Sequence, residues 1–366
     1  MVIGAGAFGG WTAFHLRRMG AEVTLVDAWA PGHSRASSGG ETRVIRAVYG
    51  TDRIYVEMVK RSYEWWKQLD ATTSHEPLYV ETGALWLHRG DDAYVRSSAT
   101  VMHDLGFPLE AIPLDDARKR YPQIRFEGVK SVWLEHIAGA LSARRACGVV
   151  RDAFVEMGGT YRTESVNPAS MKIDADAYVF ACGPWLGQLF PELIGDRVRP
   201  TRQEVYYFGT PRGSDRYQPA KLPIWIDFGE RILYGIPDTH GRGFKVADDT
   251  RGEVIDPTTA DRRPSADGIN RARTLLRERF PELADAPLVH AEVCQYENSP
   301  DGHLIADKHP SMKNTWIAGG GSGHGFKLSP AMGELMATAV LTGKELPAQF
   351  KLDRATAKPS TQFERK

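Results

Sequence analysis

Apolar side chains recur along this chain at two spacings, which predict helices and strands. Over residues 55–69 they return every three or four positions, as expected for an amphipathic helix with a buried aromatic face. Further helices are expected at 141–157 and 330–341. Short runs rich in apolar, β-branched and aromatic residues predict strands at 78–88, 160–166, 177–183, 200–209, 224–245 and 315–318. The segment 78–88 reads as two strands paired around Thr82 and Gly83.

The N-terminal segment predicts strand, helix and strand, with a glycine-rich turn after the first strand. Gly4 would allow the tight turn, Gly6 would let a pyrophosphate approach the backbone, and Gly9 would let the helix pack on the sheet. The helix is expected to stop at Gly20, and the second strand ends at Asp27, whose carboxylate can accept hydrogen bonds from a ribose. This setting predicts a dinucleotide with its diphosphate at the helix N-terminus. The alternative is a glycine-rich turn in an ordinary βαβ unit.

The order of the elements predicts an α/β fold (α+β overall) of two domains. A Rossmann-like nucleotide-binding domain would comprise residues 1–75, 138–198 and 300–366. A second domain, with a mixed or antiparallel sheet, would comprise residues 76–137 and 199–299 and bind the substrate. The ligand would lie at the junction, outside the carboxyl ends of the parallel strands.

Composition and termini narrow the choice of partners. The 366 residues include 46 Lys or Arg and 46 Asp or Glu, so the zero formal net charge gives no electrostatic case for nucleic acid or an anionic membrane. No apolar run approaches a membrane span, and no secretory signal precedes the glycine-rich turn. The separated cysteines Cys147, Cys182 and Cys294 make neither a disulfide framework nor a metal site, which favours a reducing cytoplasm. We expect native residues to be missing before Met1, where the first strand reads as cut short, and the polar tail from Ala355 to be frayed.

A second glycine-rich segment, residues 37–46, follows the first two strands by one loop. Its small side chains, including Ser37, Ser38 and Thr42, would let a planar ligand approach the backbone closely. Arg43 and Arg46 are three positions apart and would share a face if the segment made a helical turn. Two guanidiniums beside a glycine loop suit phosphate or carboxylate binding. The alternative is a solvated basic turn.

A third glycine-rich segment, residues 319–327, leads into the helix expected at 330–341. So many glycines are costly in an ordered turn unless something approaches the backbone. If that ligand is a flavin, the N-terminus of the helix would stabilise negative charge that develops on reduction. Lys327 could bind a substrate carboxylate, or it could be a solvated lysine at the helix start. The residues that we expect to contact the cofactor are Gly321, Gly323, His324, Gly325, Phe326 and Lys327.

These motifs together resemble the D-amino-acid-oxidase superfamily of flavoproteins. The glycine fingerprint, the SSGGETRVIR loop, the ACGPW strand end and the GGGSGHGFKLSP turn occur in the family's order, and the resemblance spans nearly the whole chain. It is strongest to the monomeric sarcosine oxidase and N-methyltryptophan oxidase group. The resemblance implies FAD rather than NAD, contacts of Cys182, Gly183 and Trp185 with the cofactor, and a monomer.

The resemblance also assigns roles within the predicted site. In that group, a cysteine followed two residues later by tyrosine holds FAD covalently, which implies an 8α-S-cysteinyl link at Cys294. The alternative is that Cys294 is a small buried hydrophobe. The arginine and lysine that bind the substrate carboxylate match Arg46 and Lys327, and Arg43 matches an arginine close to the flavin. A pocket tyrosine matches Tyr234.

Two further positions bear on the oxidant and the substrate. A lysine that promotes the reaction with oxygen matches Lys245, where a cation would stabilise the charge that develops on oxygen. The group's histidine four residues later is replaced by Asp249, which puts sarcosine itself in doubt. An acid there could favour a substrate with a second amine, or it could face solvent. Trp86 and Trp225 could build an aromatic wall for a larger side chain, or they could be core residues.

The predicted reaction is FAD-dependent oxidation of the C–N bond of an amino acid or of an N-methyl or cyclic secondary amine. The product would be an imine, and O2 would reoxidise the flavin to give H2O2. One alternative is a dehydrogenase that passes electrons to another acceptor, and a second is a biosynthetic amine oxidase acting on a heterocycle. A non-catalytic FAD-binding protein would not need Arg46, Tyr234, Lys245 and Lys327. The fingerprint alone would suggest an NAD-dependent dehydrogenase, which the later glycine-rich segments and Cys294 disfavour.

Overall fold

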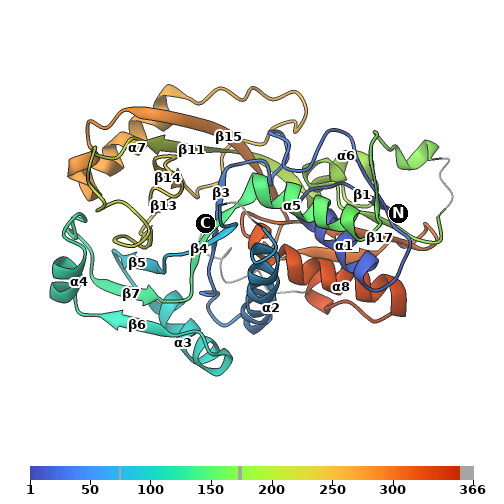
Figure 1. Ribbon diagram of the computed structural model, residues 1–366, viewed down its shortest axis with the longest axis horizontal. Coiled ribbons are helices and arrows are strands. Elements are labelled where there is room, and N and C mark those ends of the chain that lie inside the picture. The colour runs from blue at the N-terminus through green and yellow to red at the C-terminus, as the bar shows by residue number, and fades with distance from the viewer. Residues whose placement is uncertain (74–75, 172–174, 355–366) are drawn as a thin grey trace.

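The computed structural model describes residues 1–73, 76–171 and 175–354, so the tail expected to fray lies outside the described residues. In the described part, a six-stranded sheet has the order β16-β17-β10-β1-β2-β9 (Figure 1). All its neighbours are parallel except β16 and β17. The strands are β1 (Val2–Ile3), β2 (Thr24–Asp27), β9 (Thr160–Thr163), β10 (Tyr178–Phe180), β16 (Ile305–Lys308) and β17 (Thr315–Gly319).

A second sheet of the described residues has eight strands in the order β15-β11-β14-β13-β12-β5-β7-β6. Its pairs are antiparallel except β12 with β5, which makes it the mixed sheet that the sequence predicts. The strands are β5 (Ala84–His88), β6 (Leu109–Ile112), β7 (Ser131–Glu135), β11 (Arg199–Phe208), β12 (Ile224–Phe228), β13 (Ile232–Ile236), β14 (Phe244–Asp248) and β15 (Leu288–Asn298).

A small antiparallel sheet of β3 (Thr42–Ile45), β8 (Gly139–Ser142) and β4 (Tyr79–Glu81) completes the strands of the described residues. The predicted pairing of two strands around Thr82 and Gly83 is wrong. β4 pairs with β8, whereas β5 joins the eight-stranded sheet between β12 and β7. The chain changes sheets at Gly83, whose φ is +71°. All five residues of β5 are buried between partners distant in sequence, which a local pattern cannot reveal.

The four predicted helices form as α1 (Ala7–Arg18), α2 (Arg53–Asp70), α5 (Ala143–Glu156) and α8 (Ser329–Thr342). α1 packs against α5 and α8, and α2 packs against α8. Gly20, with φ +93°, follows the end of α1 as expected. Within the described residues, every helix is too short or too polar to cross a bilayer. The remaining helices, which were not predicted, are α3 (Ala93–Leu105), α4 (Leu114–Arg120), α6 (Leu186–Leu189) and α7 (Ala266–Arg279).

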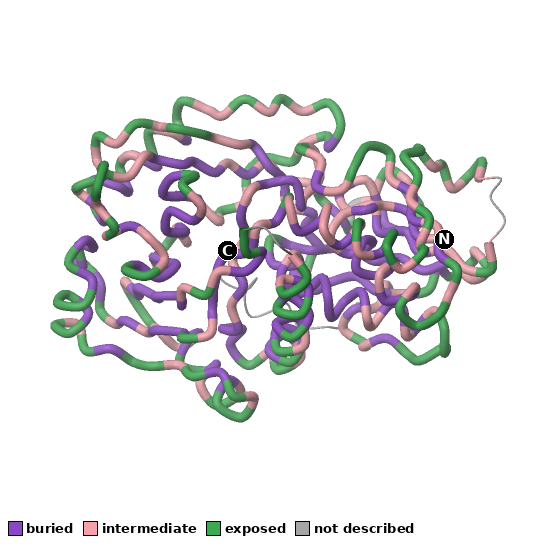
Figure 2. Tube along the Cα trace, viewed as in Figure 1, coloured by how far each residue is buried: buried purple, intermediate pink, exposed green. Residues whose placement is uncertain are grey.

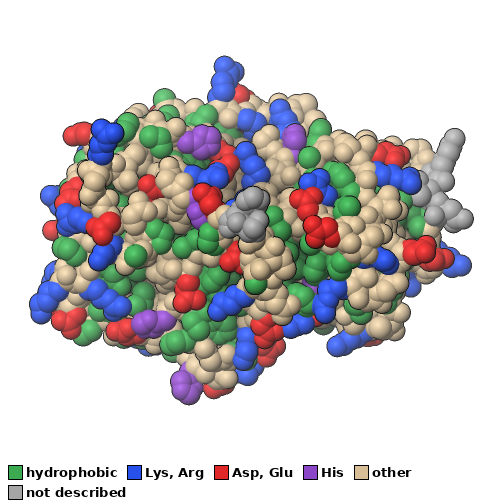
Figure 3. Space-filling view, viewed as in Figure 1, with side chains coloured by type: hydrophobic (Ala, Val, Ile, Leu, Met, Phe, Trp, Pro, Cys, Tyr) green, Lys and Arg blue, Asp and Glu red, His purple; other side chains and the backbone are tan. Residues whose placement is uncertain are grey.

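The strands of both large sheets are mostly buried (Figure 2), and acidic and basic side chains are interspersed over the face shown in Figure 3.

The strands of the parallel sheet come from three separated parts of the sequence, and the strands of the eight-stranded sheet come from the parts between them. The predicted fold class is therefore confirmed. The exact domain borders remain a proposal.

A buried ion cluster ties the eight-stranded sheet to α7. Asp227 and Arg279 have side chains that are 1% and 2% exposed, and Arg279 Nε lies 2.6 Å from Asp227 Oδ2. Arg89 also donates to both carboxylate oxygens, at 2.7 and 2.6 Å. Burial opposes the charged form, but the two guanidiniums still hold the pKa of Asp227 below its usual value.

We therefore expect Asp227→Ala to lower the free energy of unfolding by about 3–5 kcal/mol, because it leaves a buried arginine without its counter-charge. Urea unfolding of the purified protein measures the change. The matched control is Glu57→Ala, which removes an exposed partner of Arg53 and should cost at most about 1 kcal/mol. Equal effects of the two substitutions would contradict this account of the cluster.

Candidate functional site

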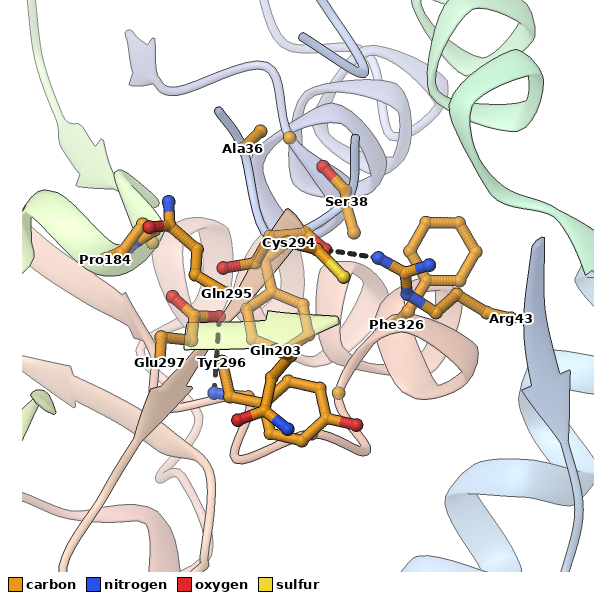
Figure 4. Close-up of a pocket in the computed structure, with 18 of the residues that line it drawn as sticks. Ala36, Ser38, Arg43, Pro184, Gln203, Cys294, Gln295, Tyr296, Glu297 and Phe326 are labelled. Carbon is orange, nitrogen blue, oxygen red and sulfur yellow. Dashed lines mark hydrogen bonds between the residues drawn. The ribbon is translucent and has the colours of Figure 1, made fainter. Parts of the chain in front are cut away.

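A cavity of about 420 Å³ lies where the carboxyl ends of the parallel strands face the eight-stranded sheet (Figure 4). Its volume is in the range of small-molecule and cofactor sites. Gly9, Thr42 and Lys245 are outside its lining. The predicted site residues that line it are Gly4, Gly6, Asp27, Ser37, Ser38, Arg43, Arg46, Cys182, Gly183, Trp185, Tyr234, Asp249, Cys294, Gly321, Gly323, His324, Gly325, Phe326 and Lys327.

The three fingerprint glycines meet different local demands. Gly4 has φ +100°, and a Cβ there would lie 2.4 Å from the Ala181 carbonyl oxygen. A Cβ on Gly9 would lie 1.8 Å from the Gly4 carbonyl oxygen, so the close approach of α1 to the turn requires glycine. A Cβ on Gly6 would meet only Ser38 Oγ, at 3.4 Å. Gly6 is thus the position that the protein's own packing leaves open towards the cavity.

The nucleotide end of the cavity lies beside the N-terminus of α1. No side chain of the described residues caps that terminus, so its first N–H groups stay available for an anion. Asp27, at the end of β2, accepts hydrogen bonds from Ala5 N at 2.7 Å and Trp29 N at 2.9 Å. Trp29, which the sequence analysis missed, lines the cavity and its ring lies 4.9 Å from that of Trp185. The signal available in the sequence was an aromatic residue two positions after Asp27, the acid that ends the strand.

Two cations converge on Tyr49 at the other end of the cavity. The Arg46 guanidinium lies 5.0 Å from the Tyr49 ring centroid, and Lys327 Nζ lies 5.2 Å from the same centroid. Lys327 Nζ donates to the His324 carbonyl at 3.2 Å, and the Tyr49 hydroxyl bonds to His324 Nδ1 at 3.1 Å. Arg46 also faces Trp86, at 5.3 Å. The arrangement can bind a carboxylate by a fork and a point charge.

Arg43 and Arg46 do not share a face, contrary to the helical turn considered from their spacing. Arg43 lies in strand β3 and Arg46 directly follows its last residue, Ile45, so the segment is extended and makes no helical turn. Arg43 turns to the loop, where it donates to the Ser37 carbonyl at 2.9 Å (Figure 4). Arg46 turns to Tyr49 instead. The two cations therefore serve different parts of the cavity.

Glu135, at the end of β7, supports the backbone beside Arg46. Its fully buried carboxylate accepts a hydrogen bond from Ala47 N. Burial raises the pKa of Glu135 to about 7, against the opposing effects of that hydrogen bond and of Arg46. Glu135 was not among the predicted site residues, although an acid that ends the apolar run SVWLE and is buried is unusual.

Lys245 lies in a buried position behind the cavity wall. Its side chain is 1% exposed, and Nζ donates to the Thr42 carbonyl at 2.9 Å. Nζ also lies 5.7 Å from the ring centroid of Tyr234, which does line the cavity. Burial, with the nearby charge of Arg43, lowers the pKa of Lys245 to about 7.

Asp249, the position that departs from the resemblance, lies on the cavity wall and pairs with Tyr296. The Tyr296 hydroxyl donates to Asp249 Oδ1 at 2.7 Å. Burial and the Asp249 charge raise the pKa of Tyr296 and of Tyr234, so both phenols stay neutral. Tyr296 is the tyrosine two residues after Cys294 in the cysteine motif, but it was not among the predicted site residues.

The remaining predicted residues lie either in the wall of the cavity or in the hydrophobic core. Cys294 is buried, lines the cavity and forms no disulfide. Trp86 also lines the cavity, whereas Trp225 is fully buried in the core of the eight-stranded sheet, where it stacks on Phe244. Trp86 is thus available as an aromatic wall, and Trp225 is a core residue.

A glycine-rich turn, an uncapped helix and a cavity that ends in two cations define a nucleotide-cofactor enzyme. The model of the FAD dependent oxidoreductase family matches residues 1–339. Monomeric sarcosine oxidase of Bacillus sp. (strain B-0618) is 30% identical, with 99% of this chain and 97% of that one covered. N-methyl-L-tryptophan oxidase of Salmonella arizonae is 28% identical, with 93% and 94% covered. The crystal structure of L-proline dehydrogenase from P. horikoshii has a TM-score of 0.83 at 21% identity, covering 96% of each chain.

The chain belongs to the FAD dependent oxidoreductase family, and its cofactor is FAD. The predicted family and cofactor are therefore confirmed. The cavity fits FAD by its own features: the open backbone at Gly6, the uncapped start of α1, and the carboxylate of Asp27. In addition, Ser37 and Glu297 line the cavity, and their buried atoms Oγ and Oε2 have no hydrogen-bond partner among the described residues.

Proposed function

We propose that this protein oxidises the C–N bond of an amino acid or of an N-methyl or cyclic secondary amine to an imine, with O2 as the final electron acceptor. The observation that carries the proposal is that Arg46 and Lys327, which both line the FAD cavity, converge on the ring of Tyr49 behind its wall. Two cations beside neutral phenols suit an anionic carboxylate with an adjacent amine. The names of the two relatives, which specify oxidation of sarcosine and of N-methyl-L-tryptophan, support the same substrate class.

In this mechanism the protein orients the substrate. Arg46 and Lys327 hold the carboxylate, which fixes the amine and its carbon relative to the cavity wall. Tyr234 and Tyr296, kept neutral by burial, offer hydroxyl groups to the amine without adding charge. FAD, when bound, supplies the two-electron acceptor. Water then hydrolyses the imine after it leaves the two cations.

We assign the reaction with oxygen to Lys245. A protonated lysine near the site stabilises the negative charge that develops on oxygen as it accepts electrons. The alternative is a dehydrogenase that uses another acceptor. Turnover of an amino acid in air distinguishes them: we expect one H2O2 per imine formed, and product without peroxide would favour the dehydrogenase.

We assign selection of the substrate side chain to Asp249 and Trp86, which lie on the cavity wall. A carboxylate at this position favours a substrate with a second amine. A specialised heterocyclic amine therefore remains the second candidate substrate. Rates measured with simple N-methyl, cyclic, primary and diamino acids would separate the classes, because a simple amino acid lacks the group that Asp249 would bind. The monomeric state and the cytoplasmic location also remain predictions.

We further propose that Cys294 holds FAD covalently through the 8α-methyl group. Cys294 is buried and lines the cavity, on the strand that also carries Tyr296, and the cation Arg43 lines the same cavity. We expect acid precipitation to leave the flavin with the protein, and Cys294→Ser to release it. The matched control, Cys147→Ser, changes a buried cysteine outside the cavity lining and should leave the flavin attached. Flavin released from the unaltered protein would exclude the link.

A further inference from the structure

A buried carboxylate in the wall of the FAD cavity has no role in the proposed reaction. Glu297, near the end of β15, is 8% exposed and lines the cavity. Its Oε1 accepts a hydrogen bond from Gly321 N at 3.2 Å, and its backbone carbonyl accepts one from Ser322 N at 3.1 Å. Its Oε2 has no partner among the described residues. Leaving a buried carboxylate oxygen unsatisfied is costly, so the position calls for a donor from a ligand.

The neighbours of Oε2 show which part of the cavity a donor from the ligand would have to reach. A Cβ on Gly183 would lie 3.0 Å from this oxygen, and one on Gly321 would lie 2.8 Å from Oε1. Both glycines follow strands of the parallel sheet, so the carboxylate bridges the ends of β10 and β17. Figure 4 shows Glu297 beside Pro184 and Gln295, with its hydrogen bond to the Gly321 backbone dashed. Oε2 thus lies against the Gly183 turn, in a stretch of the cavity wall that Gly183, Gly321 and Glu297 line together.

Side chains alternate between the two sides of β15, so Glu297 points away from the side that carries Cys294. Cys294 and Tyr296 point to one side of the strand, and Gln295 and Glu297 point to the other. The Gln295 amide is already engaged, since it donates to the Arg35 carbonyl and accepts from Arg262. Glu297 is therefore the member of this face that retains hydrogen-bonding capacity.

The chemistry of an ionised carboxylate selects among the parts of FAD. Burial raises the pKa of Glu297 to about 7, against the opposing effect of the Gly321 N hydrogen bond. Above that pH the carboxylate is ionised and only accepts hydrogen bonds, so it cannot pair with a phosphate, which carries like charge and offers no donor. The fingerprint turn and the N-terminus of α1 already suit the diphosphate, at the end of the cavity marked by Gly6 and Asp27. The ring end is marked by Cys294 and Lys327. Between these ends the cofactor carries its ribityl chain, whose hydroxyl groups are donors.

We propose that Glu297 is a cofactor-binding residue that accepts a hydrogen bond from a ribityl hydroxyl of FAD through Oε2. The proposal rests on the FAD cofactor and does not depend on the proposed amine oxidation. Its test measures cofactor affinity without any amine, so its failure and the failure of the proposed function are distinguishable.

The experiment compares FAD with its 2′-, 3′- and 4′-deoxyribityl analogues. Apoprotein carrying Cys294→Ser is used so that binding stays reversible, and the Kd of each cofactor is measured by fluorescence quenching. We expect one analogue to bind about 10- to 100-fold more weakly than FAD, as for a lost hydrogen bond to a charged group. In Glu297→Leu this difference should vanish, because the acceptor is gone. In the conservative Glu297→Gln it should shrink without vanishing.

Gln295→Leu is the matched control, on the same face of the same strand, and should keep the full difference between FAD and that analogue. If Glu297→Leu does not fold, the analogue series on the parent protein and on Glu297→Gln still decides. Equal affinity of the parent for FAD and all three analogues would overturn the proposal. So would a difference that persists undiminished in either Glu297 variant, or one that is lost equally in Gln295→Leu.

Discussion

Arg46→Met is expected to lower kcat/KM for an amino-acid substrate by about 30- to 5,000-fold, corresponding to about 2–5 kcal/mol for loss of one partner of a buried charge pair. The guanidinium lies between Tyr49 and Trp86, in a site where solvent screening is weak. Lys327 alone would hold the carboxylate by a point charge and without the fork of Arg46. The effect should appear mainly in KM, and steady-state rates over a range of substrate concentrations measure it.

Two comparisons make this expectation specific. Arg46→Lys keeps the charge without the planar fork, so it should recover only part of the loss. An amine substrate whose carboxylate is replaced by a neutral amide should be oxidised slowly by the unaltered protein and lose little further in Arg46→Met. If Arg46→Met penalised both substrates equally, the residue would act through the structure of the site and not through the carboxylate.

Lys245→Met is expected to slow reoxidation of the reduced protein by O2 about 100- to 1,000-fold, the magnitude typical for loss of one electrostatic stabiliser. Reduction by the amine in the absence of oxygen should change little, because Lys245 lies behind the cavity wall. Stopped-flow absorbance measures the two half-reactions separately. Lys313→Met, at a residue outside the cavity lining, is the control and should leave both rates unchanged.

The pH dependence gives this expectation a sign. Burial lowers the pKa of Lys245 to about 7, so the ammonium is present below that pH and is lost above it. The rate of the oxygen reaction should therefore fall as the pH rises through about 7, and the Lys245→Met protein should show no such fall. An oxygen reaction of the variant as fast as that of the unaltered protein would remove Lys245 from this role.

Much of the nucleotide end could be predicted because its signals are local. The turn at Gly4, the packing of Gly9 and the strand-ending Asp27 lie within one βαβ unit, in which Gly9 packs on Gly4 and Asp27 accepts a hydrogen bond from Ala5. The helix at 55–69 was predictable for the same reason, since its buried face repeats at the helical spacing. Family motifs then placed Arg46 and Lys327 at the opposite end of the cavity.

The features that sequence analysis missed depend on contacts between distant segments. Glu135 accepts a hydrogen bond from the Ala47 amide, which is distant in sequence. Glu297 lies between the glycine turns at Gly183 and Gly321, which only the fold brings together. The separation of β4 from β5 likewise depends on partners elsewhere in the chain. Periodicity along one segment carries no information about such long-range pairing.

The most direct test of the central claim is an anaerobic titration of the purified protein, loaded with FAD, against N-methyl, cyclic, primary and diamino acids. The account predicts that one of these classes bleaches the flavin absorbance stoichiometrically, and that admitting oxygen restores the band with formation of H2O2. A flavin band that none of these amines bleaches, in protein that dithionite reduces normally, would contradict the assignment of amine oxidation.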